Sequence, residues 1–239
     1  MQWADGRSVS DSLGTSAQAR PQHQDRLTAR RFYASVVGGV FRLTEDMCQH
    51  GASPGWMMYI GVDDVDASVT AITAAGGSVQ MAAFDIPDVG RIAMVSDPQG
   101  APFYVMRGAS DKESTACDPD RIGHGAWHEL HATDGPKATD FYTAQFGWGK
   151  SRAMDMGPMG TYQLIAIGGR DLGGIMTDGS FPRPAWLVYF RVDGIERAAG
   201  RIVEAGGQVT HGPMEVPGGG WIVNGLDPEG AMFALTGTR

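Results

Sequence analysis

The C-terminal third of the chain has the clearest pattern of hydrophobic and polar positions. Residues Trp186–Val192 form an apolar run rich in aromatic and β-branched side chains, which predicts a strand. A short helix is expected next, because Ile195, Ala199 and Ile202 recur at the spacing of one helical face. Asp193 lies directly before these positions and is the candidate N-cap.

Three further strand patterns complete this stretch. Gly206 and Gly207 end the helix, where the chain needs a residue free to adopt the left-handed conformation. The strand candidates are Gln208–His211, Trp221–Gly225 and Met232–Thr236. Between the last two, Asp227-Pro228-Glu229-Gly230 has the signature of a type I turn. Residues 184–237 therefore predict a βαβββ unit, that is, a strand, a helix and three strands.

The same unit occurs earlier in the chain, displaced by 130 residues. Trp56–Phe103 aligns with Trp186–Phe233 without a gap, and 17 of these 48 positions are identical. A repeat of this length is too long for a solenoid and is typical of a domain. The sequence therefore indicates a tandem duplication.

The first half of the C-terminal domain repeats the pattern once more. Trp127–Thr133 is a strand candidate, and Thr133 or Asp134 can cap a helix that has Pro136 in its first turn and ends at Gly147. The strand patterns after it are Lys150–Asp155, Tyr162–Ile167 and Asp171–Met176. Residues 122–177 thus predict another βαβββ unit.

We expect a first domain over residues 1–110, a polar linker over 111–121 and a second domain over 122–239. The displacement of 130 places Met1 opposite His131, so the counterpart of the strand at Trp127–Leu130 would precede the first residue. The first unit of domain one is therefore expected to be truncated or degenerate, or to begin at an altered start. Residues 1–31 contain few large apolar side chains and are expected to be poorly ordered.

Paired βαβββ units with a late Asp-Pro-x-Gly turn resemble the glyoxalase/bleomycin resistance/dioxygenase superfamily, also called vicinal oxygen chelate (VOC) proteins. The stretch His211–Leu235 is similar to two-domain bacterial members, and the resemblance covers Arg31–Gly237. It implies an α+β fold of two tandem glyoxalase-type domains. In such a fold two units pair their sheets into a cup that contains the site.

Classical members of that superfamily bind a divalent metal through His, Gln and Glu side chains on the first and last strands of the units. The resemblance places these positions at Trp127, Leu187 and Ala234, and an earlier carboxylate position at Gly173–Gly174. None of these side chains donates to a divalent cation. We therefore expect no metal and no other cofactor.

The segment GHGAWHELH holds the densest group of polar side chains. Because side chains alternate along a strand, Trp127, Glu129 and His131 share one face, and His128 lies on the other. On this register Glu129 and His131 are a candidate catalytic acid/base pair. The alternative is a structural role, with Glu129 satisfied by neighbouring donors and His131 at a solvated rim. A slip of one residue would present His128 instead.

The expected lining of the cup is aromatic and apolar, which suits flat apolar ligands, although core packing is the commoner role for such side chains. Arg191 is expected to pair with Glu129 or with an anionic ligand, or else to lie at a solvated strand end. The candidate ligand-binding residues are Trp127, Leu187, Tyr189, Arg191, Trp221, Met232 and Ala234.

The amino-acid composition limits the classes of binding partner that we expect for this protein. The net charge of −8 argues against a nucleic-acid or anionic membrane surface. Two cysteines without zinc spacing fit a reducing compartment, and no apolar run approaches the roughly 20 residues of a membrane span. We expect a cytoplasmic protein with a small-molecule partner and no nucleic-acid or membrane partner. A homodimer is a candidate assembly.

Three functions follow from these patterns. The first is metal-free binding of a small apolar or aromatic molecule, or of a reactive carbonyl, in the cup of domain two. The second is a glyoxalase-like lyase or isomerase with Glu129 as general base. The third is a duplicated structural or interaction module without catalysis.

Overall fold

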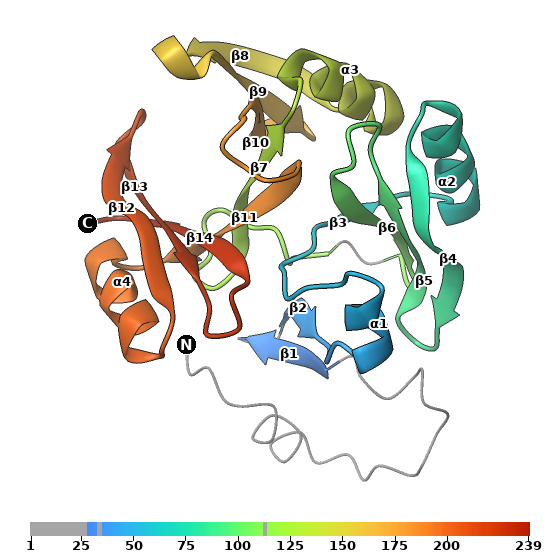
Figure 1. Cartoon of the computed structure of the whole chain (residues 1–239), viewed down its shortest axis with the longest axis horizontal. Helices are drawn as coiled ribbons and strands as arrows, with labels where there is room; N and C mark the ends of the chain where they lie inside the picture. Colours follow the sequence, from blue (N-terminus) through green and yellow to red (C-terminus); the bar gives the residue numbers. More distant parts are fainter. Residues whose placement is uncertain (1–27, 33–34, 112–113) are drawn as a thin grey trace, which may run out of the picture. The chain divides into compact units, whose positions relative to one another are not determined.

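The structure, a computed structural model, describes residues 28–32, 35–111 and 114–239 (Figure 1). The chain divides into two compact units, each assembled from separate stretches. Unit 1 contains the described residues up to Trp56 together with Ser114–Gly125 and Phe190–Arg239. Unit 2 contains the described residues of Met57–Glu113 together with Ala126–Tyr189. The domain limits 1–110 and 122–239, with their linker, stay a prediction from the repeat.

The first part of unit 2 is a βαβββ unit with a four-stranded sheet in the order β3-β6-β5-β4. Its elements are β3 (Tyr59–Gly61), α2 (Val65–Ala74), β4 (Ser78–Ile86), β5 (Gly90–Ser96) and β6 (Pro102–Gly108). Asp64 caps α2, because its side chain accepts a hydrogen bond from the Ala67 amide at 3.0 Å. Val65 and Ile72 of α2 and Ile60, Ala93 and Val105 of the sheet are all buried in one hydrophobic cluster.

The second part of unit 2 confirms the βαβββ pattern predicted over residues 122–177. Its elements are β7 (Gly125–Ala132), α3 (Gly135–Phe146), β8 (Gly149–Asp155), the short 3-10 helix η1 (Gly157–Met159), β9 (Thr161–Ile167) and β10 (Arg170–Thr177). Strands β7 and β10 are parallel, with Glu129 opposite Gly174. The order β7-β10-β9-β8 places β7, the strand with the candidate acid/base pair, at one end of this set.

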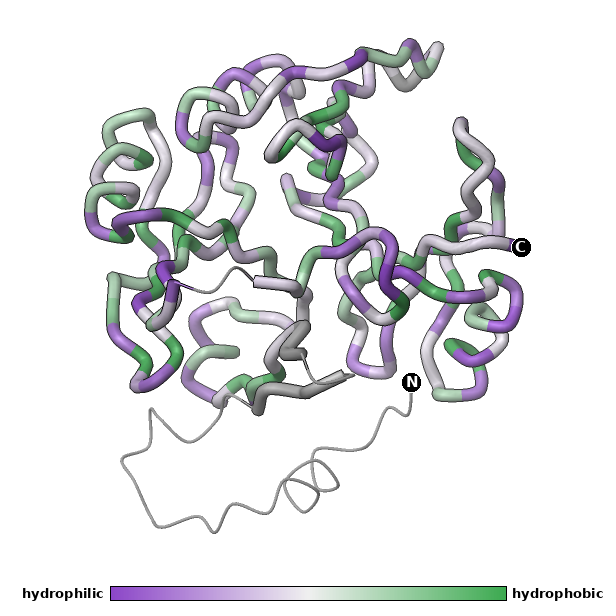
Figure 2. Tube along the Cα trace, turned by 180° about the vertical axis from the view of Figure 1, so that it is seen from behind, coloured by the Kyte–Doolittle hydropathy of each residue, from purple (hydrophilic) through white to green (hydrophobic). Residues whose placement is uncertain are grey.

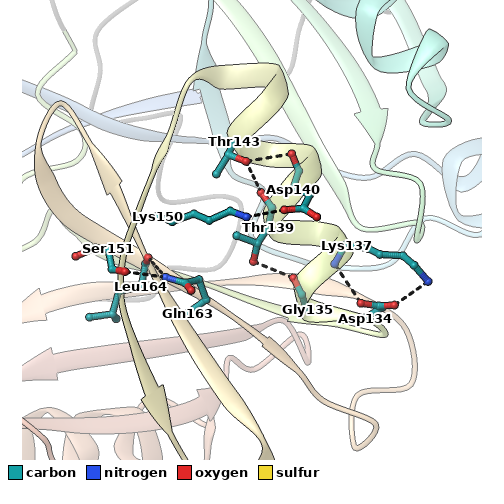
Figure 3. Close-up of polar contacts among 10 residues, drawn as sticks. All are labelled: Asp134, Gly135, Lys137, Thr139, Asp140, Thr143, Lys150, Ser151, Gln163 and Leu164. Carbon is teal, nitrogen blue, oxygen red and sulfur yellow. Dashed lines mark hydrogen bonds and ion pairs between the residues drawn. The ribbon is translucent and has the colours of Figure 1, made fainter.

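Helix α3 begins and ends as its sequence predicts, and Figure 3 shows the contacts at its start. The Asp134 side chain accepts from the Lys137 amide at 3.1 Å and forms an ion pair with the Lys137 ammonium at 2.9 Å. Lys150 of β8 contacts Asp140 at 2.6 Å, which joins the strand to the helix. Gly147 ends α3 in the left-handed conformation, with a φ of 65°.

A buried polar chain joins the two parts of unit 2. The Tyr142 hydroxyl of α3 donates to Asp97 at 3.2 Å and accepts from the indole N–H of Trp186 at 3.0 Å. Gln99 and Asp134 bond reciprocally, at 2.6 and 2.8 Å. Because Asp97 and Gln99 belong to the turn before β6, these bonds link segments that are far apart in sequence.

The C-terminal part of the chain confirms the βαβββ pattern of residues 184–237. Strand β11 (Ala185–Val192) runs from unit 2 into unit 1, and the elements after it are α4 (Ile195–Glu204), β12 (Gln208–Val216), β13 (Gly220–Leu226) and β14 (Met232–Gly237). Asp227 accepts from the Gly230 amide at 2.9 Å, as expected for the type I turn. Figure 2 shows hydrophobic and hydrophilic segments interspersed along the chain.

Two expectations for this part are wrong in detail. The N-cap of α4 is Gly194 and not Asp193, because Asp193 pairs with the Arg197 guanidinium instead of with a backbone amide. Strand β12 extends to Val216, well beyond His211, because an antiparallel partner in β13 continues its ladder through register shifts.

The N-terminal part of the described chain contains β1 (Thr28–Phe32), β2 (Ser35–Val40) and α1 (Glu45–Gln49). Strands β1 and β2 pair antiparallel, so residues 28–31 of the segment expected to be poorly ordered lie in a strand. The rest of that prediction, residues 1–27, lies outside the described residues. Within the described chain, no helix is both long and apolar enough to cross a membrane.

Candidate functional site

Glu129 is the centre of a polar cluster within unit 2, the Glu129 cluster, formed by Trp127, Glu129, His131, Tyr162, Asp178 and Tyr189. One carboxylate oxygen accepts from the Tyr162 hydroxyl at 2.7 Å and the other accepts from the Tyr189 hydroxyl at 3.0 Å. Tyr162 in turn accepts from the indole N–H of Trp127 at 2.8 Å. Trp127 and Glu129 thus meet at the same phenol, as their shared face on β7 predicts.

His131 lies between two carboxylates. Its Nδ1 is 2.8 Å from Asp178 and its Nε2 is 3.0 Å from Glu129. The contact with Glu129 lies off the direction of the ring N–H, so it is an ion pair and not an aligned hydrogen bond. The Phe181 ring stacks on the imidazole with a centroid separation of 3.7 Å. His131 is buried, so the placement at a solvated rim is wrong.

The electrostatics of the cluster favour a charged pair. Burial raises the pKa of Glu129, but His131 and the two phenols more than offset this effect and hold that pKa below its ordinary value of 4.5. Burial lowers the pKa of His131, but Glu129 and Asp178 outweigh it and raise the pKa above 6.5. Glu129 is therefore ionised near neutral pH, and its charge in turn favours the protonated form of His131.

Tyr162 fills space that the resemblance assigns to a metal-ligating carboxylate. A Cβ added at Gly174 would overlap the Tyr162 ring. The positions that correspond to the other ligands hold Trp127, Leu187 and Ala234, and the last two are buried apolar side chains. Among the described residues, no group of three or more His, Cys, Asp or Glu side chains is arranged to hold a metal ion. The family's divalent metal therefore does not fit these residues.

The remaining predicted ligand-binding residues differ in their surroundings. Tyr189 belongs to the Glu129 cluster, and Leu187 is almost fully buried two residues before it. In unit 1, Trp221 lies under the Arg239 guanidinium at 4.8 Å, and Met232 is exposed. Arg191 belongs to unit 1, where its backbone bonds to Gly123 and His124. Its pairing with Glu129 stays a prediction.

Sequence reasoning missed two members of the site and underestimated a third. Asp178 and Phe181 follow β10, and only the parallel pairing of β10 with β7 brings Asp178 to His131. Tyr162 was expected only as part of the strand Tyr162–Ile167, but its hydroxyl bonds both Trp127 and Glu129. The sequence offers one indication of these residues, which is their place in the chain. Asp178 and Phe181 follow a predicted strand of the same unit, and Tyr162 lies within one.

The comparisons with known proteins agree with this architecture. Residues 121–235 match the family model of the glyoxalase/bleomycin resistance protein/dioxygenase superfamily. The Mycobacterium tuberculosis protein named "Putative glyoxylase CFP32" is 36% identical over 252 residues, which cover 93% of this chain and 94% of that protein. The chain therefore belongs to the glyoxalase/bleomycin resistance protein/dioxygenase superfamily.

Further similar proteins are one named for anthracycline biosynthesis and two metalloenzyme-fold structures, a glyoxalase and a dioxygenase. The anthracycline biosynthesis protein DnrV of Streptomyces peucetius is 36% identical over 196 residues, covering 80% of this chain and 68% of that protein. A manganese-bound glyoxalase of Novosphingobium aromaticivorans has a similar fold, with a TM-score of 0.54 and 18% identity over 75% of this chain and 61% of its own. Homoprotocatechuate 2,3-dioxygenase of Brevibacterium fuscum reaches a TM-score of 0.57 at 14% identity, over 89% of this chain and 62% of its own. These two likenesses concern the fold alone, and the chain spans less than two thirds of either enzyme.

Proposed function

We propose that this protein binds a small planar aromatic molecule with hydroxyl or carbonyl groups at the Glu129 cluster, without a metal. The observation that carries the proposal is the position of the Tyr162 phenol. It overlies Gly174 and bonds Trp127 and Glu129, where the resemblance calls for metal ligands. The Tyr162 phenol, which forms hydrogen bonds, thus occupies the space where the resemblance places a metal-coordinating carboxylate.

The chemistry of the cluster suits such a ligand. Trp127, Tyr162 and Tyr189 combine large ring surfaces with polar tips, which can contact a flat ring system and its substituents together. Glu129 stays ionised because its pKa is lowered, so it remains an acceptor for a phenolic hydroxyl. The similarity to a protein named for anthracycline biosynthesis supports a polycyclic aromatic ligand.

Binding of a hydroxyanthraquinone dye such as alizarin tests the proposal by quenching of tryptophan fluorescence. We expect saturable binding by wild type, and binding weaker by about tenfold or more in Glu129→Gln, because a neutral amide replaces a charged acceptor. Glu204→Gln removes an exposed carboxylate of α4 and is the matched control. Elemental mass spectrometry before and after dialysis against a chelator measures the metal. Equal binding by the Glu129 variant, or a stoichiometric metal that dialysis does not remove, would contradict the proposal.

The second candidate is a glyoxalase-like lyase with Glu129 as general base. The adjacency of Glu129 and His131 on β7 and the similarity to a protein named as a glyoxylase favour it. The lowered pKa of Glu129 argues against it, because a base works best when its pKa is near the operating pH. Consumption of methylglyoxal, with and without glutathione, by wild type but not by Glu129→Gln would favour the lyase.

A further inference from the structure

A cleft of about 380 Å³, the hairpin cleft, lies in unit 2 where the turn between β4 and β5 meets the end of β6. A volume of this size suits a small molecule. The residues that line it are Asp85, Ile86, Pro87, Asp88, Gly90 and Arg91 of the hairpin and Arg107, Gly108 and Ala109 at the end of β6. None of them belongs to the Glu129 cluster, so the cleft is a separate place in the fold.

The charged side chains along the strands of this cleft lie on the side of the sheet that carries α2. Arg91 of β5 donates to both carboxylate oxygens of Asp66 of α2, at 2.8 and 2.9 Å. The register places Arg91 directly opposite Asp85 of β4 and directly opposite Arg107 of β6. Residues directly opposite one another share a face of the sheet. The row of Asp85, Arg91 and Arg107 therefore belongs to the same face as the helix.

The two arginines of this row differ in how completely carboxylates engage them. Arg91 binds Asp66 through two nitrogens and contacts Asp85 through the third at 3.2 Å. Within the part of the chain that the structure describes, Arg107 forms one ion pair, from its Nη2 to the exposed Asp111 at 2.9 Å. The Nε and Nη1 groups of Arg107 are thus available to a carboxylate, whose shape the guanidinium fork matches.

Asp88 lies at the tip of the hairpin in the left-handed conformation, with a φ of 62°. Among the described residues it is the one non-glycine with a positive φ. The corresponding position in the other repeat is Gly218, with a φ of 107°, so the turn forms without a side chain here. A side chain in this conformation costs free energy, and such residues cluster at functional sites. The Asp88 carboxylate lines the cleft and has no hydrogen bond or ion pair with another described residue.

The charges of the lining balance one another, with two arginines against two aspartates. A ligand of a single sign would therefore meet repulsion as well as attraction. The free donors of Arg107 and the free acceptor of Asp88 instead match a molecule that carries both an anionic and a cationic group. Ile86, Pro87 and Ala109 add apolar surface between these charges.

We propose that the hairpin cleft binds a small zwitterion, an α-amino acid with an aliphatic side chain. Arg107 binds its carboxylate, Asp88 binds its ammonium group, and Ile86 and Pro87 contact its side chain. Arg91 is held by its two aspartates and positions the hairpin. This ligand differs in class from the aromatic molecule at the Glu129 cluster, so the two sites are independent of one another.

The first experiment compares three compounds on wild type by isothermal titration calorimetry. They are L-leucine, 4-methylpentanoate, which lacks the ammonium group, and 3-methylbutylamine, which lacks the carboxylate. We expect saturable binding of L-leucine and binding of the other two that is weaker by about tenfold or more, because each loses one charge-assisted contact.

The second experiment removes each protein charge in turn. Arg107→Gln and Asp88→Asn should each bind L-leucine roughly tenfold more weakly than wild type and should bind alizarin as wild type does. Asparagine tolerates the left-handed conformation, so Asp88→Asn keeps the turn. The matched controls are Arg152→Gln on β8 and Asp171→Asn on β10, which change exposed side chains outside the cleft and should leave L-leucine binding intact.

Three results would overturn the proposal. They are a wild type without saturable binding of L-leucine, wild-type binding of 4-methylpentanoate or 3-methylbutylamine as tight as that of L-leucine, and unchanged L-leucine binding by both cleft variants. The comparison of compounds uses wild type alone, so it decides the matter even where a variant fails to fold. Loss of alizarin binding by Glu129→Gln with intact L-leucine binding would show that the two sites act separately.

Discussion

At the scale of single residues, the candidate site is a set of charges that stabilise one another in a buried place. Glu129, His131 and Asp178 form a carboxylate–imidazole–carboxylate series, and each of the two phenols donates to one oxygen of Glu129. Removal of one partner from a buried pair is more destabilising than exchange of the whole pair for apolar groups. The cluster therefore makes the stability of the protein depend on pH.

Substitution of His131 tests this dependence. The pKa of His131 is raised in the folded state, so its contribution to stability is complete below about pH 6.5 and is lost as pH rises through the folded-state pKa. We expect His131→Gln to lower the free energy of unfolding at about pH 6 by about 3 kcal/mol and to remove this alkaline decline. Denaturant titration across pH measures both effects. The same titration of His50→Gln, a change at an exposed histidine, should follow wild type.

The lowered pKa of Glu129 acts in the opposite direction. The contribution of Glu129 to the stability of the fold is present above about pH 4.5 and is lost as pH falls through the folded-state pKa.

Strand alternation was enough to place Glu129 and His131 on one face. It could not supply Asp178, Tyr162 or Tyr189 as their partners, because those contacts depend on which strands become neighbours.

At the scale of elements, the three complete βαβββ patterns were predictable because local rules agree with one another. Helix α3 begins at the Asp134 cap with Pro136 in its first turn, and it ends at Gly147, as expected. The N-cap of α4 was not predictable from Asp193, because a nearby arginine competes for its carboxylate. Local chemistry thus fixed the number and order of the elements, and tertiary pairing decided their ends.

Strand β10 carries a close packing constraint at Gly174. Gly174→Ala should drive the Tyr162 ring away from Glu129 and break its bonds with Trp127 and Glu129. We expect a loss of about 1–3 kcal/mol in the free energy of unfolding, together with weaker alizarin binding. Gly149→Ala on β8 is the control, because its Cβ would make an ordinary contact of 3.6 Å with Ala166. A Gly174→Ala protein as stable as this control would show that Tyr162 relaxes freely.

At the scale of the whole molecule, the repeat was visible in the sequence, but the composition of the compact units was not. Unit 2 combines residues from both sides of the segment predicted as a linker. The buried chain of Asp97, Tyr142 and Trp186 joins its two parts. No periodicity along the sequence reports a contact between residues that are 45 positions apart.

Tyr142→Phe tests whether the two parts of unit 2 unfold together. It deprives Asp97 of a donor and Trp186 of an acceptor, so we expect a loss of about 1–3 kcal/mol. Hydrogen exchange should accelerate in both 57–111 and 126–189. Tyr59→Phe changes an exposed tyrosine and should stay within about 0.5 kcal/mol of wild type. Acceleration confined to α3 would mean that the two parts are independent.

The ring of Tyr162 over Gly174 also constrains the order of substitutions by which a carboxylate could be placed at position 174. A glutamate side chain at position 174 would overlap the Tyr162 ring. Replacement of Tyr162 alone would remove the hydrogen-bond partner that Glu129 and Trp127 share. Each single step is therefore unfavourable on its own, although the combined change need not be. Stepwise substitution is therefore disfavoured, and a designer who wishes to place a carboxylate at position 174 must replace Gly174 and Tyr162 together.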